Sequence, residues 1–313
     1  MPLDPQTKKL LDVMKSSGLP PINELPVSDA RKRVIALFPN NGRLVPIGSV
    51  GNRTIPMHWG EMPCRIYSPE GDGPFPVLTY IHGGGWTINN VDIYDSACRH
   101  ITKNSECIVV SIEYRLAPEV KFPEQLEDEY RAVEWIHRNA RSFNGDPLKF
   151  AIGGDSSGGN QATVICLMSR DRGGPDIKYQ LLIYPVTDYY MPFAWSCEEY
   201  GTDYFGLGKD QMTWFWNNYL KDGADVNDPY ISPLRAKSLK GLPAAHIVTA
   251  EYDAVRDAGE EYAKKLRDAG VNVKLSRCDG LAHGFIQHWR VVDKALASLA
   301  EMGREMKNFM SSL

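Results

Sequence analysis

One segment indicates the architecture of this chain most strongly: KFAIGGDSSGG, residues 149–159. Its first part, Lys149–Ile152, has the apolar and β-branched composition of a buried strand. A helical pattern follows over residues 158–169, and the two are joined by Gly154-Asp155-Ser156-Ser157-Gly158, which fits the pattern G-x-S-x-G. The segment therefore predicts a strand, a sharp turn and a helix in direct succession.

This turn predicts a reactive serine. Small residues two positions before and after Ser156 leave room for a strained turn that raises its hydroxyl above the sheet. The N-terminus of the following helix, near Ser157, favours negative charge at the same place. A phosphate-binding glycine loop is the alternative, but no lysine follows the glycines and the G-x-G-x-x-G spacing is absent. Ser156 is thus the candidate nucleophile.

Further strands are predicted on both sides of this segment. Short apolar runs rich in β-branched and aromatic residues occupy 76–84, 107–114, 179–186, 244–253 and 271–278. Helical patterns lie between or after them, for example at 123–140 and 291–310, while alternating stretches between residues 40 and 75 suggest peripheral antiparallel strands. Strands that alternate with helices predict an α/β fold with a mostly parallel sheet covered on both faces.

Two regions do not follow this alternation. Residues 4–38 have the pattern of two helices, broken at 18–21, with Ser28 as a candidate N-cap of the second. Residues 187–240 are rich in large aromatic side chains mixed with acidic ones. A linker would not carry so many large aromatic residues, so we expect an inserted helical element there.

A second glycine motif, His82-Gly83-Gly84-Gly85-Trp86, directly follows the predicted strand at 77–81. Three consecutive glycines suggest a backbone that must approach another group closely, although a flexible loop is the alternative. A loop of this type supplies amide donors to an oxyanion hole. We expect His82 to hold the loop in shape.

A serine nucleophile needs a histidine and an acid, and both are predicted at strand ends. Asp253 follows the strand at 244–250 and His283 follows the last strand. A neutral imidazole accepts the serine proton, and the carboxylate fixes its tautomer. Asp257 is the competing acid, but it is expected to complement the dipole of the next helix. The other histidines are predicted to be structural or at the surface: His58, His100, His137, His246 and His288.

Composition restricts the class of protein. The 313 residues are 43% hydrophobic and carry a net charge of −4 with no basic block, which argues against a nucleic-acid partner. No apolar run approaches a membrane span, and residues 1–15 contain no apolar signal region. The six cysteines are scattered, so neither a zinc site nor disulfides are expected. These features predict a cytoplasmic enzyme.

With these motifs in this order, the chain resembles the hormone-sensitive-lipase family of microbial carboxylesterases, within the α/β-hydrolase superfamily. The resemblance extends over nearly the whole chain. It rests on HGGGW (82–86), YRLAPE (114–119), FPEQLED (122–128), GDSSGG (154–159), YPVTD (184–188), DAVRDAG (253–259) and HGF (283–285).

The resemblance implies an α/β-hydrolase fold, with an eight-stranded, mostly parallel sheet flanked by helices and a helical cap. Residues 1–45 and 187–235 would form the cap, and 46–186 and 236–313 the core. Ser156, Asp253 and His283 would be the catalytic residues. The amides of the oxyanion hole would come from Gly83, Gly84, Gly85 and Ser157, with Gly84 and Gly85 as the main glycine donors. For substrate binding we name Trp86, Asp155, Phe205 and Trp214.

The family implies a serine carboxylesterase for short- to medium-chain acyl esters, without metal or cofactor, with a homodimer as a family-level expectation. A lipase or an amidase on the same triad is the alternative. A non-catalytic receptor, similar to the plant gibberellin receptors, is disfavoured because those lose the histidine that His283 supplies here. The chain departs from the family pattern at Ser157, where alanine is common, at Ala254, where proline is common, and at Asn89-Asn90, where Gly-Asp is frequent. These departures bear on substrate preference.

Overall fold

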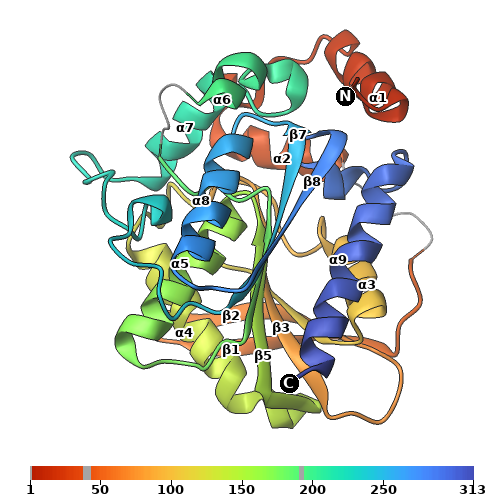
Figure 1. Ribbon diagram of the computed structural model, residues 1–313. Coiled ribbons are helices and arrows are strands. Elements are labelled where there is room, and N and C mark those ends of the chain that lie inside the picture. The colour runs from red at the N-terminus through yellow and green to blue at the C-terminus, as the bar shows by residue number, and fades with distance from the viewer. Residues whose placement is uncertain (1, 38–43, 190–193) are drawn as a thin grey trace.

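The computed structural model describes residues 2–37, 44–189 and 194–313. A single eight-stranded sheet runs through the molecule in the order β1-β2-β4-β3-β5-β6-β7-β8 (Figure 1). β1 and β2 pair antiparallel, as do β2 and β4, and every other pair is parallel. The strands are β1 (Ser49–Met57), β2 (Gly60–Ser68), β3 (Phe75–Ile81), β4 (Ile108–Ile112), β5 (Gly145–Asp155), β6 (Tyr179–Ile183), β7 (Ala244–Tyr252) and β8 (Val273–Ala282).

Helices cover both faces of this sheet. α3 (Asp95–Ser105) and α9 (Asp293–Ser311) pack together on one face, and α4 (Glu124–Asn139), α5 (Ser157–Arg172) and α8 (Arg256–Asp268) lie on the other (Figure 1). A hydrophobic cluster lies on each face of the sheet. In β3, Val77 and Ile81 face one cluster and Leu78 and Tyr80 face the other, because successive side chains of a strand point to opposite faces. The α/β class and the mostly parallel sheet are confirmed.

A third layer lies at one end of the sheet. It contains α1 (Pro5–Ser16) and α2 (Val27–Leu37), together with α6 (Trp195–Tyr200) and α7 (Lys209–Tyr219) from the middle of the chain (Figure 1). A third hydrophobic cluster contains side chains of both α2 and α7, for example Val34 and Phe215. Two segments far apart in the sequence thus pack on each other above the carboxyl ends of the strands.

The predicted elements differ from the structure in two details. α2 begins at Val27, so Ser28 lies inside its first turn and is not its N-cap. α3 was not predicted: its buried face is built largely from Ser, Cys, His and Thr side chains, so no run of large apolar residues marks it in the sequence. None of the helices in the described ranges is long and apolar enough to cross a membrane.

Candidate active site

The predicted turn forms where β5 ends and α5 begins. Ser156 joins them with φ 54° and ψ −119°, a strained backbone conformation. The hydrogen bond that its amide donates to the Ile183 carbonyl (2.9 Å) helps to hold this conformation. Glycine is required on both sides, because a Cβ on Gly154 would lie 2.5 Å from the Gly158 backbone and one on Gly158 would lie 2.0 Å from the Ile81 carbonyl oxygen. The turn therefore places the Ser156 hydroxyl beyond the end of the sheet.

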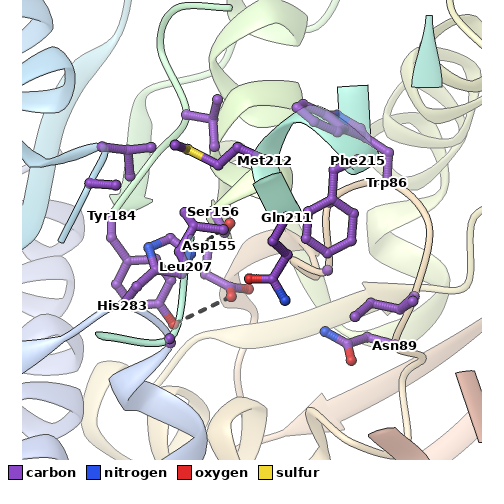
Figure 2. Close-up of a pocket in the computed structure, with 18 of the residues that line it drawn as sticks. Trp86, Asn89, Asp155, Ser156, Tyr184, Leu207, Gln211, Met212, Phe215 and His283 are labelled. Atoms are coloured by element: carbon purple, nitrogen blue, oxygen red, sulfur yellow. Dashed lines mark hydrogen bonds between the residues drawn. The ribbon is translucent and has the colours of Figure 1, made fainter. Parts of the chain in front are cut away.

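Three of the predicted residues meet at this hydroxyl. His283, directly after β8, lies with Nε2 3.0 Å from Ser156 Oγ and Nδ1 2.8 Å from Asp253 Oδ2, and Asp253, directly after β7, is fully buried. An ionised carboxylate only accepts hydrogen bonds, so His283 Nδ1 carries the proton and Nε2 is free to accept one from Ser156. Figure 2 shows Ser156 and His283 side by side in the cavity wall.

The competing acid has a different partner. Asp257, in the first turn of α8, accepts hydrogen bonds from the Ser196 amide (2.8 Å) and from the Arg256 guanidinium (2.7 Å). It thereby ties α6 to α8, whereas the carboxylate that pairs with His283 is that of Asp253. Ser196 also donates its hydroxyl to the Ala254 carbonyl (3.1 Å), which fixes the segment next to Asp253.

The glycine loop after β3 approaches the serine, but its three amides differ. The Gly83 amide donates to Asp155 Oδ1 (2.9 Å), so it is not free for a substrate, and the prediction that it belongs to the oxyanion hole is wrong. Gly84 and Gly85 line the cavity with φ 120° and 55°. No described residue accepts a hydrogen bond from the amide of Gly84, Gly85 or Ser157. These three amides remain available to an oxyanion.

Asp155, predicted to bind substrate, has most of its acceptor capacity taken by the protein. Besides the Gly83 amide it accepts hydrogen bonds from the hydroxyls of Tyr80 (2.9 Å), Tyr94 (2.8 Å) and Tyr184 (3.4 Å). Burial raises the pKa of Asp155, and the bonds from Tyr94, Gly83 and Tyr80 act against that rise. Asp155 therefore borders the cavity but serves to fix the glycine loop beneath the serine.

A cavity of about 240 Å³ opens above Ser156. Trp86 lines it as predicted, with its ring stacked on Tyr219 at 4.5 Å. The prediction for Phe205 and Trp214 is wrong, since neither is among the lining residues. Phe205 stacks on Tyr252 (5.5 Å) instead. Its neighbour Phe215 lines the cavity in place of Trp214, because successive residues on a helix point about 100° apart.

The side chains that do line the cavity were mostly not predicted. They come from the glycine loop, from the segment after β6 and from α7, and Figure 2 shows them around Ser156: Asn89, Tyr184, Leu207, Gln211, Met212 and Phe215. Gln211 and Phe215 are four residues apart, and such spacing was the available signal. Because residues 214–216 are all aromatic, the sequence does not indicate which face of α7 is turned inward. Among the described residues no group of three or more His, Cys, Asp or Glu side chains is arranged to hold a metal ion.

The chain is similar in sequence and fold to known proteins. A family model described as "alpha/beta hydrolase fold" matches residues 78–287. The carboxylic ester hydrolase LipN of Mycobacterium tuberculosis is 40% identical over 268 residues, 84% of this chain and 71% of that protein. The carboxylesterase NlhH of the same organism is 36% identical over 94% of this chain and 92% of its own length. A solved α/β-hydrolase enzyme from the metagenome of Lake Arreo has a TM-score of 0.95 and 36% identity, over 99% of both chains.

Proposed function

Since the chain belongs to the α/β-hydrolase family, in its hormone-sensitive-lipase branch, we propose that it is a serine carboxylesterase in which Ser156, His283 and Asp253 carry out the reaction. The observation that carries this proposal is the chain of two hydrogen bonds, 3.0 Å from Ser156 Oγ to His283 Nε2 and 2.8 Å from His283 Nδ1 to Asp253 Oδ2. Solved relatives include a hyperthermophilic esterase from Pyrobaculum calidifontis.

The first half of the reaction forms an acyl-enzyme. Ser156 Oγ attacks the carbonyl carbon of the ester while its proton passes to His283 Nε2. The C–O bond to the alcohol then breaks, and the leaving oxygen takes that proton from His283. The buried carboxylate of Asp253 stabilises the imidazolium that exists between these two transfers.

The second half returns the enzyme to its starting state. A water molecule gives a proton to His283 Nε2 as its oxygen attacks the acyl carbon, and Ser156 leaves with the proton that His283 returns. In both halves a negative charge develops on the former carbonyl oxygen. The amides of Gly84, Gly85 and Ser157 stabilise that charge, and loss of one such donor typically lowers the rate about 10²–10³-fold.

The substrate class follows from the cavity. Its lining is predominantly apolar, with Trp86, Leu207, Met212 and Phe215 around the serine, which supports short- to medium-chain acyl esters of small alcohols. The reaction uses side chains, backbone amides and water, and it needs neither metal nor cofactor.

The organisation of the molecule is part of the same proposal. The proposed cap comprises residues 1–45 and 187–235, over the core segments 46–186 and 236–313. Residues 1, 38–43 and 190–193 lie outside the described part of the chain, and in the rest the shared cluster of α2 and α7 side chains supports this division. Six free cysteines support a cytoplasmic location. The edge position of β8 supports a homodimer, because edge strands offer unpaired backbone groups.

Hydrolysis of p-nitrophenyl butyrate tests the proposal. We expect turnover by the wild-type protein and a loss of at least about 10³-fold in kcat for Ser156→Ala, since the nucleophile is removed. Ser142→Ala is the matched control, because Ser142 is exposed and lies at the opposite end of β5. Retained activity in Ser156→Ala would remove Ser156 from its role.

A further inference from the structure

Three polar side chains lie in the interior of the molecule behind the glycine loop. Gln125 and Glu129 belong to α4 and Gln161 belongs to α5, and all three are fully buried. None of them takes part in the reaction of the triad. Burial of polar groups is costly unless hydrogen bonds satisfy them, and apolar side chains of the same shape can be equally stable in their place. Stability alone therefore does not explain why these three are polar.

Hydrogen bonds join the three side chains to one another and to the backbone. The Gln161 amide donates to Gln125 Oε1 (3.0 Å) and to Glu129 Oε1 (2.5 Å). Gln125 in turn donates from its Nε2 to the carbonyls of Trp86 (3.2 Å) and Arg115 (2.6 Å). Both hydrogens of each amide group are used, so neither carboxamide can be turned over without loss of these bonds. The network thus ends on the last residue of the HGGGW motif.

Glu129 serves in this network as an acceptor. None of the described residues forms an ion pair with it, and its second oxygen, Oε2, is buried without a partner. Burial raises the pKa of Glu129 well above its usual range, and the charge of Asp128 adds to that rise. Because an unpaired carboxylate is costly in such surroundings, they favour the neutral acid. A neutral Glu129 holds Gln161 without adding a negative charge behind the glycine loop.

The backbone of Trp86, where the network ends, is held in an unusual conformation. Its φ of 59° lies in the left-handed region, which residues other than glycine rarely adopt. Its amide donates to Ser157 Oγ (3.2 Å), and its carbonyl accepts a hydrogen bond from the Ala117 amide (2.8 Å) in addition to that from Gln125. The surrounding residues therefore fix both the amide and the carbonyl group of Trp86.

The glycine loop is anchored on both sides of its free amides. On one side the Gly83 amide donates to Asp155, and on the other side the Trp86 backbone is held as described. The amides of Gly84 and Gly85, which are available to an oxyanion, lie between these two anchors. A small displacement of such donors weakens the stabilisation of the transition state, so both anchors bear on the rate.

We propose that Gln125 is a positioning residue for the reaction: held by Gln161 and by a neutral Glu129, it fixes the Trp86 carbonyl and thereby orients the amides of the oxyanion hole. This proposal rests on the proposed esterase function. Its role is to keep the donors in place for a charge that develops only in the transition state, so the proposal concerns kcat and not the binding of the ester.

The substitution Gln125→Met tests this role, since methionine has a similar length but forms none of the hydrogen bonds. Gln180→Met is the matched control, because Gln180 in β6 is equally buried and donates to the Pro243 carbonyl (3.0 Å), outside the network. Titration with a p-nitrophenyl phosphonate ester counts the active sites, so that kcat refers to folded enzyme alone. kcat and KM are measured with p-nitrophenyl butyrate.

A trifluoromethyl ketone gives a second measurement. Its carbonyl carbon adds the Ser156 hydroxyl, and the resulting oxyanion occupies the same hole as that of the reaction. We expect Gln125→Met to lower kcat per active site at least about fivefold, to leave KM within about twofold, and to weaken inhibition by the ketone at least about fivefold. Gln180→Met lowers the melting temperature but leaves all three values within about twofold.

Other outcomes overturn the proposal. They are a smaller fall of kcat in Gln125→Met, an equal fall in Gln180→Met, and a fall of kcat without weaker inhibition by the ketone. If the wild-type protein neither hydrolyses the butyrate nor reacts with the phosphonate, the esterase function itself has failed, and this result is distinct from the other three.

Two substitutions of Glu129 test the network without changing Gln125, and they serve also if Gln125→Met does not fold. Glu129→Gln keeps a neutral acceptor for Gln161, so kcat per active site should stay within about twofold of the wild type. Glu129→Leu removes the acceptor, and kcat should fall at least about threefold, the order expected for one lost hydrogen bond. Equal losses in both variants would refute a neutral acceptor, and an unchanged kcat in Glu129→Leu would refute the role of the network.

Discussion

Backbone conformation at single residues determines the geometry of the candidate site. Ser156, at φ 54°, and Gly84 and Gly85 of the glycine loop, at φ 120° and 55°, adopt conformations that most residues avoid, and the surrounding packing holds them there. Gly85 is constrained in two ways: it has φ 55°, and a Cβ on it would lie 2.1 Å from the ring of Phe215. A residue of the glycine loop and a residue of α7 thus fit together only when the first has no side chain.

Gly85→Ala is therefore expected to lower activity and stability together. The added methyl group displaces either the loop or Phe215, and movement of the loop misplaces the amides of Gly84 and Gly85 by enough to lower kcat about 10²-fold. We expect a lower melting temperature as well. The double variant Gly85→Ala/Phe215→Ala, measured by thermal unfolding and p-nitrophenyl butyrate hydrolysis, separates the two causes.

Relief of the clash in the double variant should restore part of the melting temperature but not the activity, because the left-handed conformation still disfavours alanine. A Gly85→Ala single variant with wild-type kcat would contradict the role of this loop.

The predictability of the site also differs between residues. Ser156, Asp253 and His283 were predictable because each follows a strand whose apolar run ends in a glycine motif or an acidic residue. Gly83 was misjudged because its amide is turned toward a buried carboxylate, which no local pattern reveals. Asp155 was misjudged for the same reason, since its tyrosine partners come from three other segments of the chain.

At the scale of elements, the strands of the sheet could be predicted from the sequence, whereas the helices of the cap could be predicted only in part. Strands β3, β5, β6 and β7 are buried on both faces and appear in the sequence as continuous apolar runs. α7 was expected as a helix, but its inward face depends on how it packs against α2 and the glycine loop. Contacts between distant segments decide that rotation, and a local hydrophobic pattern does not contain it.

At the scale of the whole molecule, buried histidines couple folding to pH. Burial lowers the pKa of His246 to about 4, and the charge of Lys274 adds to this effect. His246 lies inside β7, where it is 1% exposed. Because the folded pKa lies below the ordinary value of 6.5, the unfolded chain binds a proton that the folded chain does not between these two pH values.

The free energy of unfolding is consequently expected to be highest above pH 6.5 and to fall as the pH drops through 6.5 toward 4. His246→Gln removes this contribution. The free energy of unfolding of the wild type minus that of the variant should therefore fall by up to about 3 kcal/mol between pH 7 and pH 4. Urea unfolding at a series of pH values measures it. Parallel stability curves for the two proteins would contradict a neutral, buried His246.

The central claim is that Ser156 is acylated by an ester substrate with His283 as its base. A stoichiometric p-nitrophenyl phosphonate ester, followed by peptide mapping with mass spectrometry, tests it most directly. We predict one equivalent of released p-nitrophenol, a single phosphonylated peptide with the label on Ser156, and loss of esterase activity in proportion to labelling. Full labelling at another residue, or esterase activity that survives complete labelling of Ser156, would contradict the account.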